Sequence, residues 1–282
     1  MDRRRLLSRG AVRVAEWSVF AVMLVVNLLP VYWAMVTSFK PKRDIFVYPP
    51  KLFGFDLSFE HYKTIIDNGY LRSIVNSLFY CAASVALGLL LGYLCAYALE
   101  RNRFRLKKPI FFLIVACIPL SIGSAALLIP NYVFMSSLGL TNKWYTLVLL
   151  FAAYNLPMAI WILRSGVESV PYEIEEAARI DGCSKPYILF RVVFPLMTPC
   201  IASASLFIFI GAWNEFILAA VMMNSPSLMP VQVSIYNYLG FFGQEWGPLT
   251  ASASMAIIPS LIVFSFLGKL LVSGLTQGSV KG

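Results

Sequence analysis

Long apolar stretches alternate with polar connections along almost the whole chain. Each stretch is apolar around the full helical turn, unlike a surface helix with one polar face, and each is long enough to cross a bilayer, which takes about 20 residues. Only helices and closed barrels satisfy their backbone in lipid, and these stretches are too long and continuous for barrel strands. The pattern therefore predicts an all-α integral membrane protein with six transmembrane helices. Their expected positions are residues 17–38, 74–98, 110–134, 144–164, 200–222 and 250–272.

The composition agrees with this pattern. Of the 282 residues, 59% are hydrophobic and only 13% are charged, about half the charged share of a soluble globular protein. This balance excludes a disordered chain and argues against an ordinary soluble domain. The five cysteines form no CxxC or CxH pattern, so we expect no metal site, redox site or disulfide framework. The first apolar stretch is too long for a cleaved signal and lacks a small-x-small cleavage site.

The distribution of basic residues predicts the orientation. The net charge is +9, and 16 of the 23 Lys and Arg residues lie in the segments that share a side with both termini. Cytoplasmic segments carry the excess of Lys and Arg, so both termini are expected in the cytoplasm. The basic surplus then reports topology, and nucleic-acid binding, which needs a basic face with interleaved aromatic residues, remains a minor alternative.

The inner connection 165–199 is the most informative polar segment. Pro171 can open a helix, since its missing N–H is not needed in the first turn, and acidic residues follow it where the helix dipole favours them. Gly182 supplies a left-handed stop. We therefore expect a short cytoplasmic helix at 171–181 and a second one opened by Pro186.

Two long outer connections differ in composition. The first, 39–73, predicts a short interfacial helix capped by Asp56 or Ser58, while the lone His61 is expected to be solvated and receives no role. The second, 223–249, has no Lys or Arg and carries several aromatic residues. Such rings suit a sugar face or a protein partner, and they equally suit a loop folded over the mouth of the bundle. The candidates for contact with a partner protein are Tyr236, Tyr238, Phe241 and Phe242.

Few polar side chains lie inside the predicted spans, where a charge costs about 2.5–3.5 kcal/mol. Glu215 faces either a polar path through the membrane or another subunit, or it makes an interhelical hydrogen bond. Asn155, close to Pro157, suits repair of a helix kink, and the role of Asn76 is open. The candidates for such a path or for a subunit interface are Trp213, Asn214, Glu215, Asn155 and Asn76. No phosphate-binding motif or catalytic constellation occurs, so we expect neither enzyme activity nor a cofactor in this chain.

A spaced motif connects the inner segment to a known family. EAARIDG at 176–182, followed after nine residues by VVFP at 192–195, resembles the EAA loop of binding-protein-dependent ABC importer permeases. The chain departs from that motif at Phe194, where the family usually has Leu. RSIVNSLFYCAAS, YALERNRF and GAWNEFILA resemble the carbohydrate-type permeases of the maltose-transporter class, and the likeness covers about 12–280.

This resemblance implies a type I ABC importer permease fold in a bacterial cytoplasmic (inner) membrane. Its implied domains are 1–72 (N-terminus, first span and outer loop), 73–272 (the transmembrane type-1 domain) and 273–282 (the tail). The implied partners are the lipid bilayer, a second, non-identical permease, a dimer of ATPase subunits that binds ATP and Mg, and a periplasmic or lipid-anchored solute-binding protein.

The resemblance also assigns residues. Glu176 is the implied acidic contact to the ATPase, Ala177 and Ala178 allow close approach, and Asp181 with Gly182 end the helix. The full set of implied ATPase-coupling residues is Glu173, Glu176, Ala177, Ala178, Arg179, Asp181, Gly182 and Pro195. The implied function is import of a disaccharide, oligosaccharide or related polyol. Two alternatives remain open at this point: an ion-coupled secondary transporter, which usually needs inverted repeats and several membrane carboxylates, and an integral-membrane enzyme.

Overall fold

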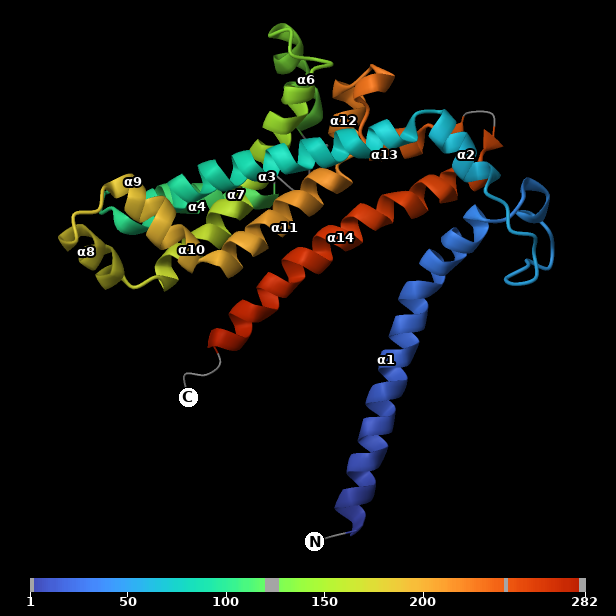
Figure 1. Ribbon diagram of the computed structural model, residues 1–282, viewed down its shortest axis with the longest axis horizontal. Coiled ribbons are helices and arrows are strands. Elements are labelled where there is room, and N and C mark those ends of the chain that lie inside the picture. The colour runs from blue at the N-terminus through green and yellow to red at the C-terminus, as the bar shows by residue number, and fades with distance from the viewer. Residues whose placement is uncertain (1–2, 120–126, 241–242, 279–282) are drawn as a thin grey trace. The chain divides into compact units, whose positions relative to one another are not determined.

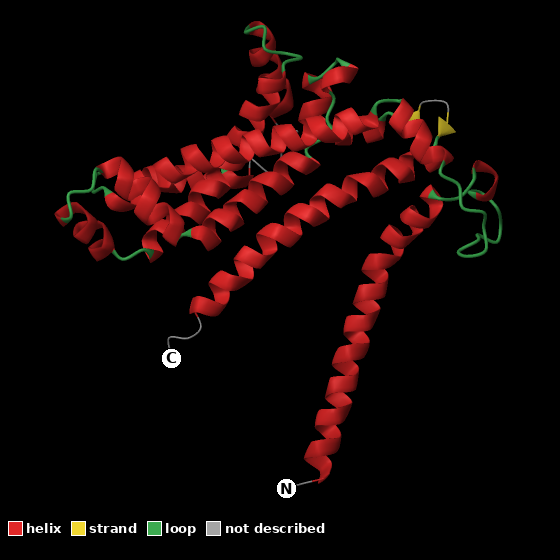
Figure 2. Cartoon of the chain, in the orientation of Figure 1, coloured by secondary structure: helices red, strands yellow, loops and turns green. Residues whose placement is uncertain are grey.

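The computed structural model describes residues 3–119, 127–240 and 243–278, and these are predominantly helical (Figures 1 and 2). The α-helices are α1 (Arg3–Ser38), α2 (Glu60–Asp67), α3 (Tyr70–Arg101), α4 (Lys107–Ala116), α6 (Leu128–Ser137), α7 (Trp144–Ser169), α8 (Tyr172–Ile180), α9 (Lys185–Tyr187), α10 (Phe194–Leu196), α11 (Thr198–Asn214), α12 (Ile217–Met222), α13 (Val231–Tyr236) and α14 (Trp246–Gly278). Short 3-10 helices are η1 (Lys42–Asp44) and η4 (Pro226–Leu228), and η3 (Ile188–Val193) is a π-helix. One antiparallel pair joins β1 (Leu239–Gly240) to β2 (Gly243–Gln244).

The chain divides into two compact units. The first unit comprises Met1–Gly69 and Ile235–Met255, and the second comprises Tyr70–Ser234 and Ala256–Gly282. The predicted boundaries at 72/73 and 272/273 delimit the transmembrane type-1 domain implied by the family resemblance. They are not boundaries of compact packing units, so they stay predictions.

Helices α3, α7 and α11 form the core of the second unit (Figure 1). Small residues let their backbones approach closely, as is common between membrane helices, where packing drives association. A Cβ added to Gly88 of α3 would lie 2.9 Å from Cδ1 of Ile208 in α11, and one added to Gly92 would lie 3.2 Å from Cδ1 of Leu163 in α7. The three helices therefore interlock at positions that only glycine can occupy without a shift.

Four of the described helices are long and apolar enough to cross a membrane: Ala15–Ser38, Tyr70–Arg101, Trp144–Ser169 and Trp246–Leu270. They correspond to four of the six predicted spans. In the window 110–134, α4 and α6 are separate ten-residue helices, and residues 120–126 between them lie outside the described residues. The count of six spans is therefore not confirmed.

The predicted span 200–222 differs from the structure in two ways. Helix α11 starts earlier and forms a bent pair with Lys185–Leu196, at 83° across the break near Met197. It also ends at Asn214, because the backbone at Glu215 is extended (φ −72°, ψ 115°), and α12 resumes at Ile217. The prediction of one continuous helix was therefore wrong at Glu215.

Asn142 fixes the connection that follows α12. It adopts a left-handed conformation (φ 58°), and its backbone N–H donates to the carbonyl of Met222 at 2.8 Å. Its side chain donates to Oγ of Ser225 at 2.7 Å and accepts from the backbone N–H groups of Asn224 and Ser225. One residue thus supplies both the turn and the hydrogen bonds that hold this segment to the start of α7.

Replacement of Asn142 by alanine is expected to destabilise the second unit by about 2–3 kcal/mol, because it removes three hydrogen bonds and because alanine tolerates the left-handed region less well than asparagine. Asn142→Gly loses the same bonds but keeps the backbone conformation, so it should recover about 1 kcal/mol. Thermal unfolding of both variants in detergent measures the difference. Equal stability of Asn142→Ala and the parent chain would show that these bonds contribute little.

In the first unit, the outer connection folds around a buried lysine. Lys40 is buried, with its Nζ 5.2 Å from the ring centroid of Trp33 and 5.6 Å from that of Phe55. Burial lowers the pKa of Lys40, and the nearby Asp44 carboxylate opposes that shift. Lys51 pairs with Asp44 at 3.2 Å.

His61 was expected to be solvated, and the structure corrects this. The side chain is 5% exposed, and its Nε2 lies 2.9 Å from the carbonyl oxygen of Lys40. A short helix is present in the predicted segment as α2, and Oγ of Ser58 accepts the backbone N–H of Glu60 at 3.3 Å; the position of α2 at a membrane interface stays a prediction. Asp56, the other predicted cap, pairs with Arg43 instead.

Candidate functional site

The short helix expected at 171–181 is present as α8, with Pro171 immediately before it. Its C-terminal end is a Schellman motif: the N–H of Gly182 donates to the carbonyl of Arg179, and that of Cys183 donates to the carbonyl of Ala178, both at 3.0 Å. Gly182 has φ +80°, the left-handed conformation that glycine adopts without strain. Local sequence signals therefore set both ends of this helix.

Gly182→Ala is expected to fray the last turn of α8. A Cβ at this position would meet nothing within 4 Å, so the cost of about 1 kcal/mol comes from the positive φ alone. Gly182→Asn is the matched control, because asparagine tolerates this conformation better. Hydrogen exchange at the amides of Gly182 and Cys183 should quicken about fivefold in the alanine variant. Unchanged exchange would contradict the assignment of the motif.

One face of α8 is anchored by a buried ion pair. Oε1 of Glu175 accepts from Nε of Arg101 at 2.6 Å, and Oε2 accepts from the hydroxyl of Tyr97 at 2.6 Å. The second guanidinium nitrogen of Arg101 donates to the carbonyls of Val167 at 2.9 Å and Val170 at 2.6 Å. The end of α3, the end of α7 and the first turn of α8 are thus joined through one guanidinium group.

This pair needs its whole network. The Glu175 side chain is fully buried and that of Arg101 is 12% exposed, so both charges have left water at a cost of several kcal/mol each. The attraction between them offsets that cost only when the remaining hydrogen-bonding groups are also satisfied. Tyr97 and the two carbonyl oxygens provide that satisfaction, which makes the orientation of α8 sensitive to loss of any member.

Tyr172 adds an aromatic contact to the anchor. Its ring lies 5.8 Å from the guanidinium carbon of Arg101 and 5.4 Å from that of Arg179. Arg179 also donates to the Tyr172 hydroxyl at 3.0 Å, and this hydrogen bond raises the pKa of Arg179. The hydrogen bond and the ring contact with Tyr172 together hold Arg179 along α8.

The opposite face of α8 is open. Most of the predicted coupling residues are exposed there, and Ala178 is half-buried against the core of the second unit. Ile180 is 87% exposed, which is unusual for a large apolar side chain on a short polar helix. The exposed members of the predicted set are Glu173, Glu176, Ala177, Arg179, Asp181 and Gly182.

The second predicted helix is present as α9, η3 and α10, with Pro186 in the first turn. The hydroxyl of Tyr93 in α3 donates to the carbonyl of Leu189 at 2.6 Å, and its ring packs edge-on against Phe194, with 5.1 Å between centroids. The apolar Phe194 thus fills the place where the family motif usually has Leu. Pro195, also predicted for coupling, is exposed. Figure 1 shows α8, α9 and α10 gathered at one end of the helices α3, α7 and α11.

The residues predicted to line the pathway make contacts with their near neighbours in the chain. These contacts do not test whether the residues take part in transport. Trp213 is buried and stacks on Phe209, while the exposed Asn214 donates back to the carbonyl of Ile210. Oε1 of Glu215 accepts the N–H of Leu218 at 2.9 Å, so the carboxylate caps α12.

The two asparagines contact other elements. Nδ2 of Asn155 donates to the carbonyl of Phe151 in its own helix, and a Cβ added to Gly211 of α11 would lie 2.1 Å from its Oδ1. Asn76 donates to the carbonyls of Ser227 and Met229, which ties the N-terminal part of α3 to η4.

The aromatic residues predicted to contact a binding protein differ in how exposed they are. Tyr236 is 54% exposed, whereas Tyr238 is 9% exposed and burial raises its pKa. Little of the Tyr238 ring is therefore left for another protein. Phe241 and Phe242 lie outside the described residues. Contact between these residues and a binding protein stays a prediction.

Sequence reasoning missed the anchor of α8. Tyr97 and Arg101 lie in YALERNRF, which carried the family resemblance, and Glu175 was counted only as one of several acidic residues in a first turn. A signal was present: Tyr97 and Arg101 are four residues apart at the C-terminal end of α3, so they share a helix face. Their partner, 74 residues away from Arg101, was not readable from spacing.

Comparison with known proteins gives consistent matches. Residues 88–277 match the family described as "Binding-protein-dependent transport system inner membrane component". The chain is 35% identical to the diacetylchitobiose uptake system permease protein DasC of Streptomyces coelicolor, over 94% of this chain and 96% of that protein. It is 34% identical to the sulfoquinovosyl glycerol transport system permease protein SmoH of Agrobacterium fabrum, over 93% and 92%.

A solved structure agrees in fold. The chain superposes with a TM-score of 0.79 on the crystal structure of a bacterial ABC transporter involved in the import of the acidic polysaccharide alginate. The two sequences are 25% identical, and the match covers 95% of this chain and 98% of that one.

Proposed function

Because the chain belongs to the family of binding-protein-dependent transport system inner membrane components, we propose that it is the permease subunit of an ATP-driven importer for a sugar. The single observation that carries this proposal is the two-sided helix α8. One side is locked to α3 and α7 through Arg101 and Glu175, and the other presents Glu176 and Ile180 to solvent. An ion-coupled carrier has no use for such a docking surface, and the family removes that alternative.

The proposed partners account for that surface. A dimer of ATPase subunits binds ATP and Mg and docks on the exposed face of α8, with Glu176 facing a basic residue of the ATPase. A second, non-identical permease completes the pathway, and a periplasmic or lipid-anchored binding protein delivers the substrate. Both termini and α8 face the cytoplasm in this arrangement, as the basic residues predict.

Coupling follows from rigidity. When ATP closes the ATPase dimer, a docked α8 must move with it. A helix joined to α3 by two hydrogen bonds to one carboxylate passes that displacement to the spans instead of bending away. The chain then alternates between inward and outward access without catalysing a reaction itself.

The proposed substrate is a disaccharide, an oligosaccharide or a related glycoside or polyol. The relatives are named for diacetylchitobiose and sulfoquinovosyl glycerol, and a further one, at 30% identity over 93% of this chain, is the trehalose/maltose transport system permease protein MalG of Thermococcus litoralis. All are soluble, polyhydroxylated molecules, and this shared chemistry supports the substrate class.

Glu176→Lys is expected to reduce sugar uptake at least tenfold, because reversing a charge that is covered on docking costs about 2 kcal/mol or more. Insertion should be unaffected, since Glu176 is exposed. Glu168→Lys is the matched control: it makes the same change at an exposed position of α7 outside the motif. Uptake is measured in cells at equal membrane levels of each variant. Normal sugar uptake by the Glu176→Lys transporter would contradict the proposed coupling role.

A further inference from the structure

The loop between α3 and α4 is basic, exposed and distinct from α8. It runs Arg103, Phe104, Arg105, Leu106, and α4 then begins with Lys107 and Lys108. The side chains of Arg103, Phe104, Arg105, Lys107 and Lys108 line a hollow of about 490 Å³. All of them except the half-buried Lys107 are exposed.

Only part of this charge is neutralised within the described chain. Glu100 accepts from Arg164 at 2.8 Å and lies 3.7 Å from Nζ of Lys107. Among the described residues, no ion pair is found for Arg103, Arg105 or Lys108. Three cations of this loop therefore remain available to an external anion.

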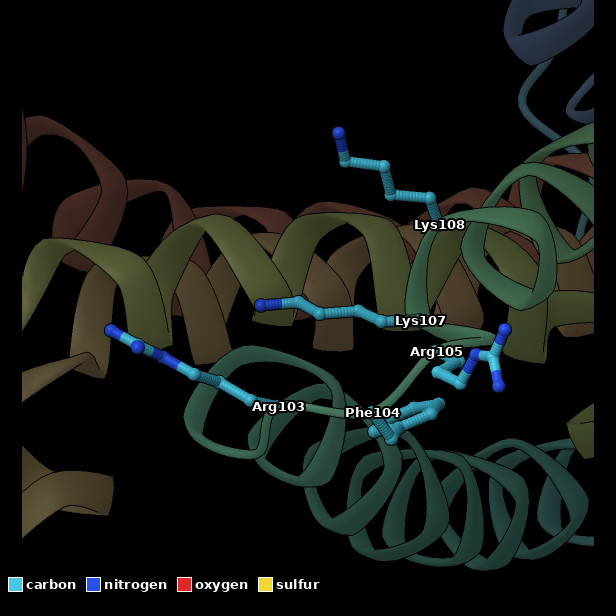
Figure 3. A pocket seen from close by; sticks show the side chains of 5 residues that line it. All are labelled: Arg103, Phe104, Arg105, Lys107 and Lys108. Carbon is cyan, nitrogen blue, oxygen red and sulfur yellow. The ribbon is translucent and has the colours of Figure 1, made fainter.

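The cations diverge. In Figure 3, Arg103, Lys107 and Lys108 extend toward the left of the view from separate positions, whereas Arg105 points to the right, so their charged ends do not meet at one point. A site for one small anion would draw its cations toward a single point. Diverging cations fit several phosphates spread over a surface.

Apolar side chains continue directly from this basic loop. Phe104 is 43% exposed and Leu106 is 62% exposed, and in α4 the side chains of Phe112 and Leu113 are 75% and 65% exposed. A band of Lys and Arg next to exposed apolar side chains matches the order of a membrane, with headgroups followed by acyl chains.

We propose that Arg103, Arg105 and Lys108 bind the phosphates of anionic phospholipids in the inner leaflet, with Phe104 set among the headgroups. Basic segments beside a span attract anionic lipid at close range. The site lies next to Arg101, so bound lipid also holds the end of α3 to which α8 is anchored. The inference rests on the proposed cytoplasmic orientation of this loop.

Titration of the detergent-purified transporter with phosphatidylglycerol tests the proposal, with thermal unfolding as the readout. The combined Arg103→Gln, Arg105→Gln and Lys108→Gln variant should need at least about tenfold more lipid for half-maximal stabilisation. The control, Arg3→Gln with Arg4→Gln and Arg5→Gln, removes three charges from the same predicted side and should titrate as the parent. If the triple variant does not assemble, Arg105→Gln alone should shift the titration about threefold.

Two results would overturn the proposal: the loop variant titrating as the parent, or inorganic phosphate giving the same stabilisation as the lipid at equal concentration, which would indicate a small-anion site. The orientation has its own test. Leu106→Cys, compared with the chain bearing only its native cysteines, should react with an impermeant maleimide only after the cells are opened. Reaction in intact cells would contradict the orientation, and so the proposed function, independently of lipid binding.

Discussion

Replacing Arg101 with alanine is expected to destabilise the second unit by about 3–5 kcal/mol and to abolish sugar uptake. The change leaves the Glu175 carboxylate buried with only the Tyr97 hydroxyl beside it, and it frees the carbonyls of Val167 and Val170. A buried charge without its partner is among the most costly defects that a substitution introduces. Thermal unfolding in detergent and uptake in cells measure the two effects.

A double variant, Arg101→Met with Glu175→Met, separates the cost of an unpaired buried charge from the loss of the ion pair that orients α8. No buried charge is left unpaired in this double variant, so it should be less destabilised than Arg101→Ala, although Tyr97 and the carbonyls of Val167 and Val170 still lose their hydrogen bonds. Arg72→Ala, at an exposed position near the other end of α3, is the control for losing an arginine from this helix. If Arg101→Ala unfolds at the same temperature as Arg72→Ala, the ion pair does not anchor α8.

The second large effect is expected for Gly166→Ala, at about 1–3 kcal/mol. The added Cβ would lie 2.8 Å from Cβ of Cys200 and 2.9 Å from Cε of Met197. The methionine end can move, but Cβ of Cys200 is fixed to its backbone, so α7 and the start of α11 must separate. The temperature of thermal unfolding and the rate of sugar uptake should both fall, because this contact lies close to α8.

Gly268→Ala is the matched control in α14, where the nearest side-chain atom is 3.9 Å from the added Cβ. Alanine is favoured over glycine inside a helix by about 0.5–1 kcal/mol, so this variant should be as stable as the parent or slightly more stable. A Gly166→Ala chain that gains stability in the same way would show that α7 and α11 are less closely packed than the structure indicates.

Features set by neighbouring residues were predicted well. The ends of α8 depend on Pro171 and Gly182, each of which acts on its own backbone, and both took the expected place. The long apolar windows likewise became helices at four positions, because length and continuous hydrophobicity are sufficient to require a helix in lipid.

Features set by distant residues were not predicted. The break at Glu215 has no proline or glycine to mark it, and the carboxylate that caps α12 reads in sequence only as a charge within a span. His61 looked solvated, yet the fold of the outer connection buries it against Lys40. A side chain that reaches a partner across the fold leaves no periodic signal.

The candidate site shows the same division. The exposed face of α8, with Glu176 and Ala177, was indicated by the motif and its spacing. The buried face depends on Glu175 meeting Arg101, and neighbouring glutamates in one turn cannot be told apart by sequence when only one of them is buried. The motif therefore marked the docking surface, and the structure supplied what holds that surface in place.

Photo-crosslinking from position 180 tests most directly whether the exposed face of α8 is the ATPase docking surface. A photoreactive amino acid in place of Ile180, which is 87% exposed, should yield an adduct of this chain with the ATPase subunit in membranes of the intact transporter. The same group at Phe112, 75% exposed in α4, should yield none. The coupling role predicts an adduct at 180 that weakens when Glu176→Lys is added, and absence of an ATPase adduct at 180 in an active transporter would contradict it.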